Sequence, residues 1–234
     1  MNVTLSIAPT TVVRTLGTIV VALTVASLAH SVSWYGFGVD YLDFGWRFDV
    51  MAEANIPTWY SSVALLICAA LALAVASAER QRGGESVRHW RGISALLLLL
   101  SLDETAGLHE WTGDALGGLA RPGYFAYAWT LAGLTAVAIV GLVYRRFVLS
   151  LPARTRASFL LASGLFAGGA LGMEMVNANY SSYFGGQNLI YALMTAVEEL
   201  AEMTGVLVFV RALFEHLQRV QSVERVSVAF AQPT

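Results

Sequence analysis

Acidic side chains interrupt an otherwise apolar stretch of the chain, residues 96–110, which reads LLLLLSLDETAGLHE. Five leucines run directly into a segment that contains Asp103, Glu104, His109 and Glu110. On insertion scales, a charged side chain at the centre of a bilayer costs about 2.5–3.5 kcal/mol. Ionisable groups in such a stretch must therefore face other helices, a water-filled cavity, a metal ion or one another.

A second acidic group lies near the end of the chain, in the segment YALMTAVEELAEMTG. Glu198, Glu199 and Glu202 fall on one face of the helix that this segment predicts, together with Thr195. Because no basic residue lies within two turns, helix-surface salt bridges do not explain the pattern. Like charges this close in a low dielectric do not all ionise, so these groups share protons or a cation.

Two further apolar segments each contribute an ionisable residue, Glu174 in LGMEMVNANYSS and His30 in the first segment. Glycines precede Glu174 and permit the close approach of a neighbouring helix. A helix rises about 1.5 Å per residue. Heights measured from the cytoplasmic end of each expected helix place all these ionisable groups between the bilayer midplane and the non-cytoplasmic face. We therefore expect four helices to bring these side chains to one polar chamber.

The composition places the chain among integral membrane proteins. Hydrophobic residues make up 56% of its 234 residues and charged residues only 13%, against about 25% in soluble domains. A membrane-spanning helix needs about 20 apolar residues, and six segments meet that requirement. The sequence thus predicts an all-α fold, a single-domain bundle of six transmembrane helices. The expected spans cover about residues 15–35, 57–78, 92–111, 124–144, 157–181 and 189–213.

Arginine placement predicts the orientation of this bundle. All 14 basic residues are arginines, and most lie before the first span, between the second and third, between the fourth and fifth, or after the sixth. The opposite connections hold only Arg47 and Arg121. By the positive-inside rule, both termini are cytoplasmic. A net charge of −2 indicates no nucleic-acid partner, so the expected partner is the lipid bilayer.

Carboxylates with one or two imidazoles suit iron, manganese or zinc. The leading hypothesis is therefore a membrane-embedded metal-binding protein, a metal-dependent enzyme with hydrolytic or oxidative chemistry on a lipid or other membrane-soluble substrate. Glu104 and Glu199 are candidates for a general base or for groups that orient the ligands. The candidate metal ligands are His30, Asp103, His109, Glu110, Glu174, Glu198 and Glu202.

Three alternatives remain open from the sequence. The same carboxylates suit a cation or proton transporter, because ionisable residues near the midplane mark such paths. The chain could also be a structural subunit of a larger membrane complex, held together by a hydrogen-bonded polar core. Haem ligation by His30 and His109 is disfavoured by the surrounding acids.

Three short segments resemble a family of uncharacterised bacterial multi-pass membrane proteins. They are FDVMAEANIPTWYSS, SLDETAGLHE and EELAEMTG, which begin at residues 48, 101 and 198. The resemblance implies a location in the bacterial inner membrane and no particular activity. It also implies that Asp49, Glu53 and Pro57 belong to the same functional unit as the helical acids.

Overall fold

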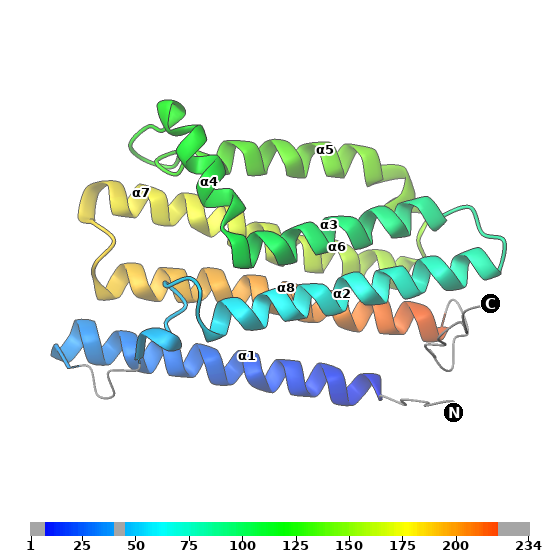
Figure 1. Ribbon diagram of the computed structural model, residues 1–234, viewed down its shortest axis with the longest axis horizontal. Coiled ribbons are helices and arrows are strands. Elements are labelled where there is room, and N and C mark those ends of the chain that lie inside the picture. The colour runs from blue at the N-terminus through cyan, green and yellow to red at the C-terminus, as the bar shows by residue number, and fades with distance from the viewer. Residues whose placement is uncertain (1–7, 40–44, 220–234) are drawn as a thin grey trace, which may run out of the picture.

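The computed structural model describes residues 8–39 and 45–219, and the regular structure in these ranges is helical (Figure 1). The predicted all-α class is therefore confirmed. One helical run, from α6 through η4 to α7, passes through a π-helical turn without a break. In chain order the elements are α1 (Pro9–Ser31), η1 (Val32–Gly36), η2 (Gly45–Arg47), α2 (Ile56–Gln81), α3 (Val87–Ala106), α4 (Leu108–Ala115), η3 (Gly117–Leu119), α5 (Trp129–Ser150), α6 (Ala153–Ala167), η4 (Gly168–Met173), α7 (Glu174–Phe184) and α8 (Leu189–Arg219).

Four helical runs in the described part of the chain are long and apolar enough to cross a membrane: Pro9–Gly36, Ile56–Gln81, Trp129–Ser150 and Ala153–Phe184. They correspond to the first, second, fourth and fifth expected spans. The other two expected spans correspond to α3 and α8, which are long enough but more polar. Every stretch of 18 residues in either helix contains at least three charged side chains.

The expected third span, 92–111, is wrong as a single helix. α3 ends at Ala106, and Gly107 adopts the left-handed conformation with φ +58°. The separate helix α4 then begins at Leu108 and leaves at an angle to α3 (Figure 1). A left-handed glycine is a common helix terminator because it lacks the Cβ that makes this conformation unfavourable.

The expected fourth span, 124–144, is displaced toward the C-terminus, since α5 begins only at Trp129. The segment before it is held against α7 by hydrogen bonds. Gly123 donates its backbone N–H to Ser182 Oγ at 3.1 Å, and the Tyr127 hydroxyl lies 3.0 Å from Ser181 Oγ. These tertiary contacts compete with helix formation and keep the segment as a turn.

The apolar core lies around α8, which packs against α1, α2 and α6. Leu65 and Cys68 of α2 and Val210 and Leu213 of α8 are almost fully buried there. α2 and α3 form an antiparallel pair in which Ser62 Oγ donates to the Ser101 carbonyl oxygen at 2.8 Å and Ser101 Oγ reciprocates at 2.8 Å. These bonds fix α3, and hence the acids at its end, relative to the core.

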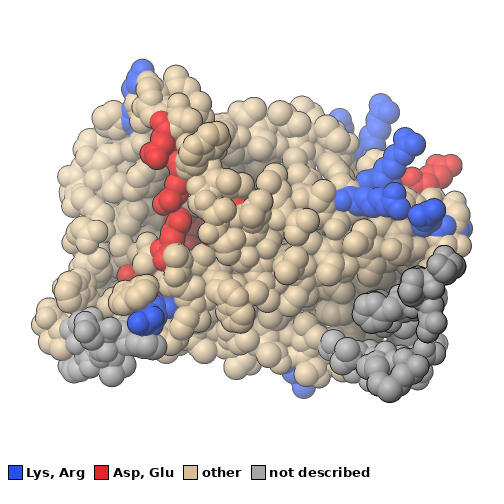
Figure 2. Space-filling view, viewed as in Figure 1, with Lys and Arg blue, Asp and Glu red and all other residues tan. Residues whose placement is uncertain are grey.

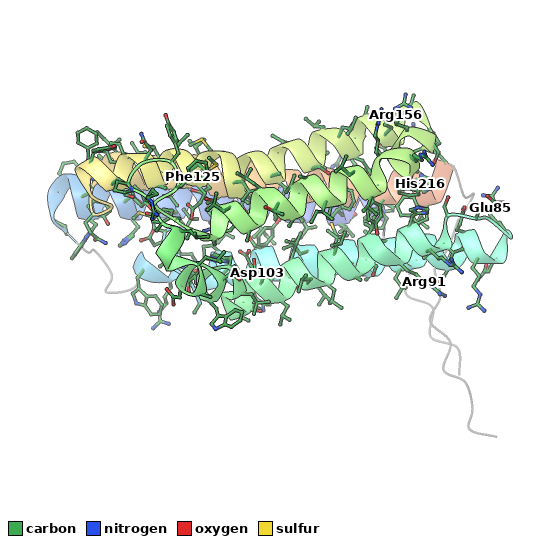
Figure 3. The ribbon with its side chains drawn as sticks, turned by 90° about the horizontal axis from the view of Figure 1, so that it is seen from above. Glu85, Arg91, Asp103, Phe125, Arg156 and His216 are labelled. Atoms are coloured by element: carbon green, nitrogen blue, oxygen red, sulfur yellow. The ribbon has the colours of Figure 1, made fainter. Side chains whose placement is uncertain are left out.

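Charged side chains are distributed unevenly between the two ends of the bundle (Figure 2). Arginine side chains gather at one end, and a column of acidic side chains crosses the surface near the other. Seen from above, Asp103 lies toward the acidic end, whereas Arg91, Arg156 and His216 lie at the opposite one (Figure 3). We call these the acidic end and the arginine end.

Candidate functional site

A cavity of about 810 Å³ occupies the acidic end of the bundle. Its volume lies in the range of small-molecule sites. Among the described residues, its lining includes one histidine and no arginine, although the chain contains 14 arginines. The acidic residues that line it are Glu53, Asp103, Glu104, Glu110, Asp114, Glu174, Glu198, Glu199 and Glu202.

The lining histidine, His109, lies between two carboxylates at the junction of α3 and α4. Asp103 Oδ1 accepts a hydrogen bond from the backbone N–H of His109 at 2.7 Å, and Asp103 Oδ2 lies 3.3 Å from Nδ1. On the other side of the ring, Nε2 lies 3.4 Å from Glu53 Oε1. The hydrogen bond to Asp103 is the largest cause that raises the pKa of His109, to about 9.

Glu53 reaches His109 because the segment before α2 is tied to the bundle. Val50 donates its backbone N–H to Ser27 Oγ of α1 at 3.1 Å. Asn55 caps α2 by accepting from the Thr58 backbone N–H at 3.2 Å, and its Nδ2 donates to the Asp49 carbonyl oxygen at 2.6 Å. Partial burial, followed by repulsion from nearby carboxylates, raises the pKa of Glu53.

Deeper in the cavity lie five inner glutamates from α3, α7 and α8. Glu174 of α7 and Glu198 of α8 each accept a hydrogen bond from a neighbouring side chain. Trp129 Nε1 donates to Glu174 Oε1 at 3.2 Å. Asn177 Nδ2, fully buried, donates to Glu198 Oε2. The inner glutamates are Glu104, Glu174, Glu198, Glu199 and Glu202.

Gly169 of η4 permits α8 to approach closely enough to place its glutamates in the cavity wall. A Cβ at this position would lie 2.6 Å from Glu202 Cγ and 2.8 Å from the Glu198 carbonyl oxygen. Neither distance is tolerated by real Cβ atoms, so only glycine fits. The neighbouring Gly168 and Gly172 have open space at the same position, so they do not serve this contact.

A family model described as a domain of unknown function (DUF8692) matches residues 14–217. The chain belongs to this family. The matched range includes all the cavity-lining residues, so the whole site lies within the DUF8692 domain. No curated protein and no solved structure shows significant similarity to the chain.

The DUF8692 fold brings eight of the nine sequence-predicted site residues to the cavity. His30 is the exception among them. Its ring packs against Gly45 of η2, and Nε2 lies 3.9 Å from Asp49 Oδ2, so it joins α1 to the segment before α2. His30 therefore does not contribute to the cavity wall. The eight residues at the cavity are Asp103, Glu104, His109, Glu110, Glu174, Glu198, Glu199 and Glu202.

Four cavity-lining residues of this DUF8692 domain were not singled out as site residues from the sequence. Asp114 lies on α4, and Trp129 is the first residue of α5. Tyr127 and Tyr191, whose hydroxyl oxygens lie 3.0 Å apart, also line the cavity. The residue types of Trp129, Tyr127 and Tyr191 do not by themselves indicate a functional site, because aromatic residues are common at membrane interfaces. Only their position beside the acids distinguishes them.

The acidic side chains of the DUF8692 cavity share a wall without forming a compact cage. Within residues 8–39 and 45–219, no three His, Cys, Asp or Glu side chains stand close enough to hold a metal ion. One nearby group has spare capacity, since the buried Asn177 Oδ1 has no hydrogen-bond partner among the described atoms. The donor set of carboxylate oxygens and one imidazole matches that of iron, manganese and zinc sites.

Proposed function

We propose that this DUF8692 chain is a membrane-embedded metal-binding protein, specifically a metal-dependent enzyme of hydrolytic or oxidative type that acts on a membrane-soluble substrate. The observation that carries the proposal is the charge of the cavity wall. Nine carboxylates and one imidazole meet there, and no arginine among the described residues offsets them. Such a wall stays folded in an apolar bundle when a bound cation or shared protons reduce its negative charge.

The metal ligands in this proposal come from two parts of the chain that line the cavity. Asp103 and His109 supply them at the junction of α3 and α4, and Glu174, Glu198 and Glu202 supply them from α7 and α8. A bound divalent ion would act as a Lewis acid and would lower the pKa of a bound water molecule. Glu110 of α4, which also lines the cavity, completes this set of candidate ligands. Glutamate side chains have three rotatable bonds, so they can converge on an ion without moving their helices.

The remaining acids and their neighbours have positioning and proton-transfer roles in the proposal. Glu104 and Glu199 are the candidate general bases, since each lines the same cavity on a different helix. Trp129 holds Glu174 and Asn177 holds Glu198 through the hydrogen bonds described above. Partners of this kind fix ligand orientation and typically change metal affinity 10–100-fold when removed.

We further propose that α3 and α8 also cross the bilayer, which makes six spans with both termini cytoplasmic. Their acids face the cavity, so the bundle shields these groups from lipid. The gathering of arginines at one end supports this orientation through the positive-inside rule (Figure 2). The cavity then opens on the non-cytoplasmic side.

Proton or cation transport is the second candidate, and the gathering of glutamates from α3, α7 and α8 at one cavity favours it. Closely spaced carboxyl groups in a low dielectric do not all ionise, so they can share and exchange protons. A transport path must, however, continue toward the arginine end. Below the cavity the described bundle is packed with apolar side chains such as Leu65, Val210 and Leu213, which favours a one-sided site.

Elemental analysis of the gently purified protein tests the metal proposal. Near-stoichiometric iron, manganese or zinc supports it, and Glu202→Gln should then lose most of the metal. Glu215→Gln is the matched control, because Glu215 lies on the same helix but pairs with Arg154 and Arg211 at the arginine end. A metal-free wild type with proton or cation flux in liposomes that Glu198→Gln abolishes would replace the metal proposal with transport.

A further inference from the structure

The cavity has a second wall, which is apolar and belongs mainly to α5 and to the run from α6 into η4. Small side chains form much of it, including Gly133, Ala136 and Ala170, and Leu100 of α3 faces them. The same cavity therefore joins a carboxylate wall to a hydrocarbon-like wall. This combination is what an amphiphilic molecule requires of its binding site.

The apolar wall opens sideways, between α3 and α5. At the arginine end the two helices touch, where the Tyr144 hydroxyl packs against Gly92 and the rings of His89 and Phe147 stack at 4.8 Å. At the acidic end the His109 ring lies 5.1 Å from the ring of Trp129, the first residue of α5. These contacts leave a window between them.

Val137 marks this window, because it lines the cavity and is also 48% exposed. The surface around the window is suited to acyl chains. Leu134, which follows the cavity-lining Gly133 on α5, is 40% exposed. Since α5 belongs to a helical run apolar enough to cross a membrane, the window opens at the depth of the lipid tails.

The carboxylate wall restricts the head group that can follow a tail through this window. Nine acidic side chains and one histidine line the cavity, and no arginine among the described residues offsets them. A wall of one sign concentrates ligands of the opposite sign and repels those of the same sign. The head group is therefore cationic or uncharged, such as an amine or an alcohol, and not a free phosphate or carboxylate.

We infer that the window between α3 and α5 admits a long-chain lipid with an amine or hydroxyl head group, whose tail lies along Leu100, Ala136 and Val137 and whose head reaches the inner glutamates. The inference rests on the proposed function for the chemistry at the acids. The access route itself rests on the cavity and the two flanking contacts.

Photolabelling in lipid nanodiscs tests this inference. The probes are a long-chain amine and a long-chain carboxylic acid that carry the same photoreactive group in the same tail. We expect the amine to label peptides containing Leu100 and Ala136 about tenfold more than the acid does. Ala136→Trp fills the window and should reduce this labelling about tenfold. Ile139→Trp is the matched control, because Ile139 is 56% exposed on the same helix and does not line the cavity.

Three other labelling results overturn the inference. Equal labelling by both probes would show that the site does not select the head group. Undiminished labelling of Ala136→Trp would show that the probe does not enter between α3 and α5. Cross-links between two copies of the chain through Val137 would make the window a subunit interface instead. Metal content is measured on the same samples. If the labelling pattern holds while no metal is found, the proposed function fails and the lipid site stands. If metal is present but the pattern is absent, the lipid site fails alone.

Discussion

Asp103 and His109 are joined across the break between α3 and α4, the side chain of Asp103 accepting the backbone N–H of His109 at 2.7 Å and facing its ring at 3.3 Å. The acid thus caps the first turn of α4 and holds the histidine at the cavity. One residue in the last turn of α3 therefore contacts both the start of the next helix and the imidazole that this helix carries.

The first prediction concerns Gly107, which lies between these two residues at φ +58°. Gly107→Ala should lower the free energy of unfolding by about 1–2 kcal/mol, because the left-handed conformation is unfavourable for a residue with a Cβ. That Cβ would also lie 3.1 Å from Glu110 Oε2. Thermal unfolding in detergent measures the effect. Gly117→Ala, at a position with open space, should change the midpoint little; an equal drop in both variants would contradict the prediction.

The second prediction compares two neighbouring glycines of η4. Gly169→Ala should lower the unfolding free energy by about 1–3 kcal/mol, since the added methyl group collides with Glu202 and the Glu198 backbone. Gly168→Ala has open space and should instead stabilise the helix by about 0.5–1 kcal/mol. Thermal unfolding of the two variants should therefore shift in opposite directions. A stabilising effect of Gly169→Ala would show that α8 does not lie this close to η4.

The third prediction concerns the indole of Trp129. Trp129→Phe keeps an aromatic side chain but removes the indole N–H that donates to Glu174. Metal affinity should therefore fall about 10–100-fold. Competition with a chelator of known affinity measures this change. Trp111→Phe serves as the control, because Trp111 of α4 is 72% exposed and does not line the cavity. Unchanged affinity in Trp129→Phe would mean that the indole does not position the carboxylate.

The fourth prediction concerns the pH dependence of stability in the chelator-treated protein. The pKa of His109 is raised from 6.5 to about 9, mainly by its hydrogen bond to Asp103, so the folded state binds this proton more tightly than the unfolded state. The resulting stabilisation is fully present below pH 6.5 and is lost as the pH rises through about 9. The raised pKa of Glu53 acts with the same sign at lower pH.

The unfolding midpoint should therefore decrease between pH 6.5 and 9, and His109→Gln should flatten that decrease. Comparison with His216→Gln controls for a general effect of histidine loss, because His216 is buried at the arginine end (Figure 3). A slope that survives in His109→Gln would assign the pH dependence to another group.

The helical fold class follows from local properties of the sequence. Runs of about 20 apolar residues must satisfy their backbone hydrogen bonds internally in a bilayer, which only helices and closed barrels achieve. The acids that line the cavity also stand out by type alone, because carboxylates within apolar helices are costly wherever they lie. The helix ends were less predictable, since Gly107 ends α3 within an apolar, acid-containing run, and hydrogen bonds to α7 delay the start of α5.

What the sequence determined by itself is therefore that helices form and that their acids need partners. Only the tertiary structure decided which groups meet. It directs His30 to Asp49 and away from the cavity, and it brings Glu53 to His109 and Trp129 to Glu174. The physical reason is that helix periodicity sets the face of a residue on its own helix, whereas the rotation and approach of neighbouring helices depend on contacts such as that of Gly169 with α8.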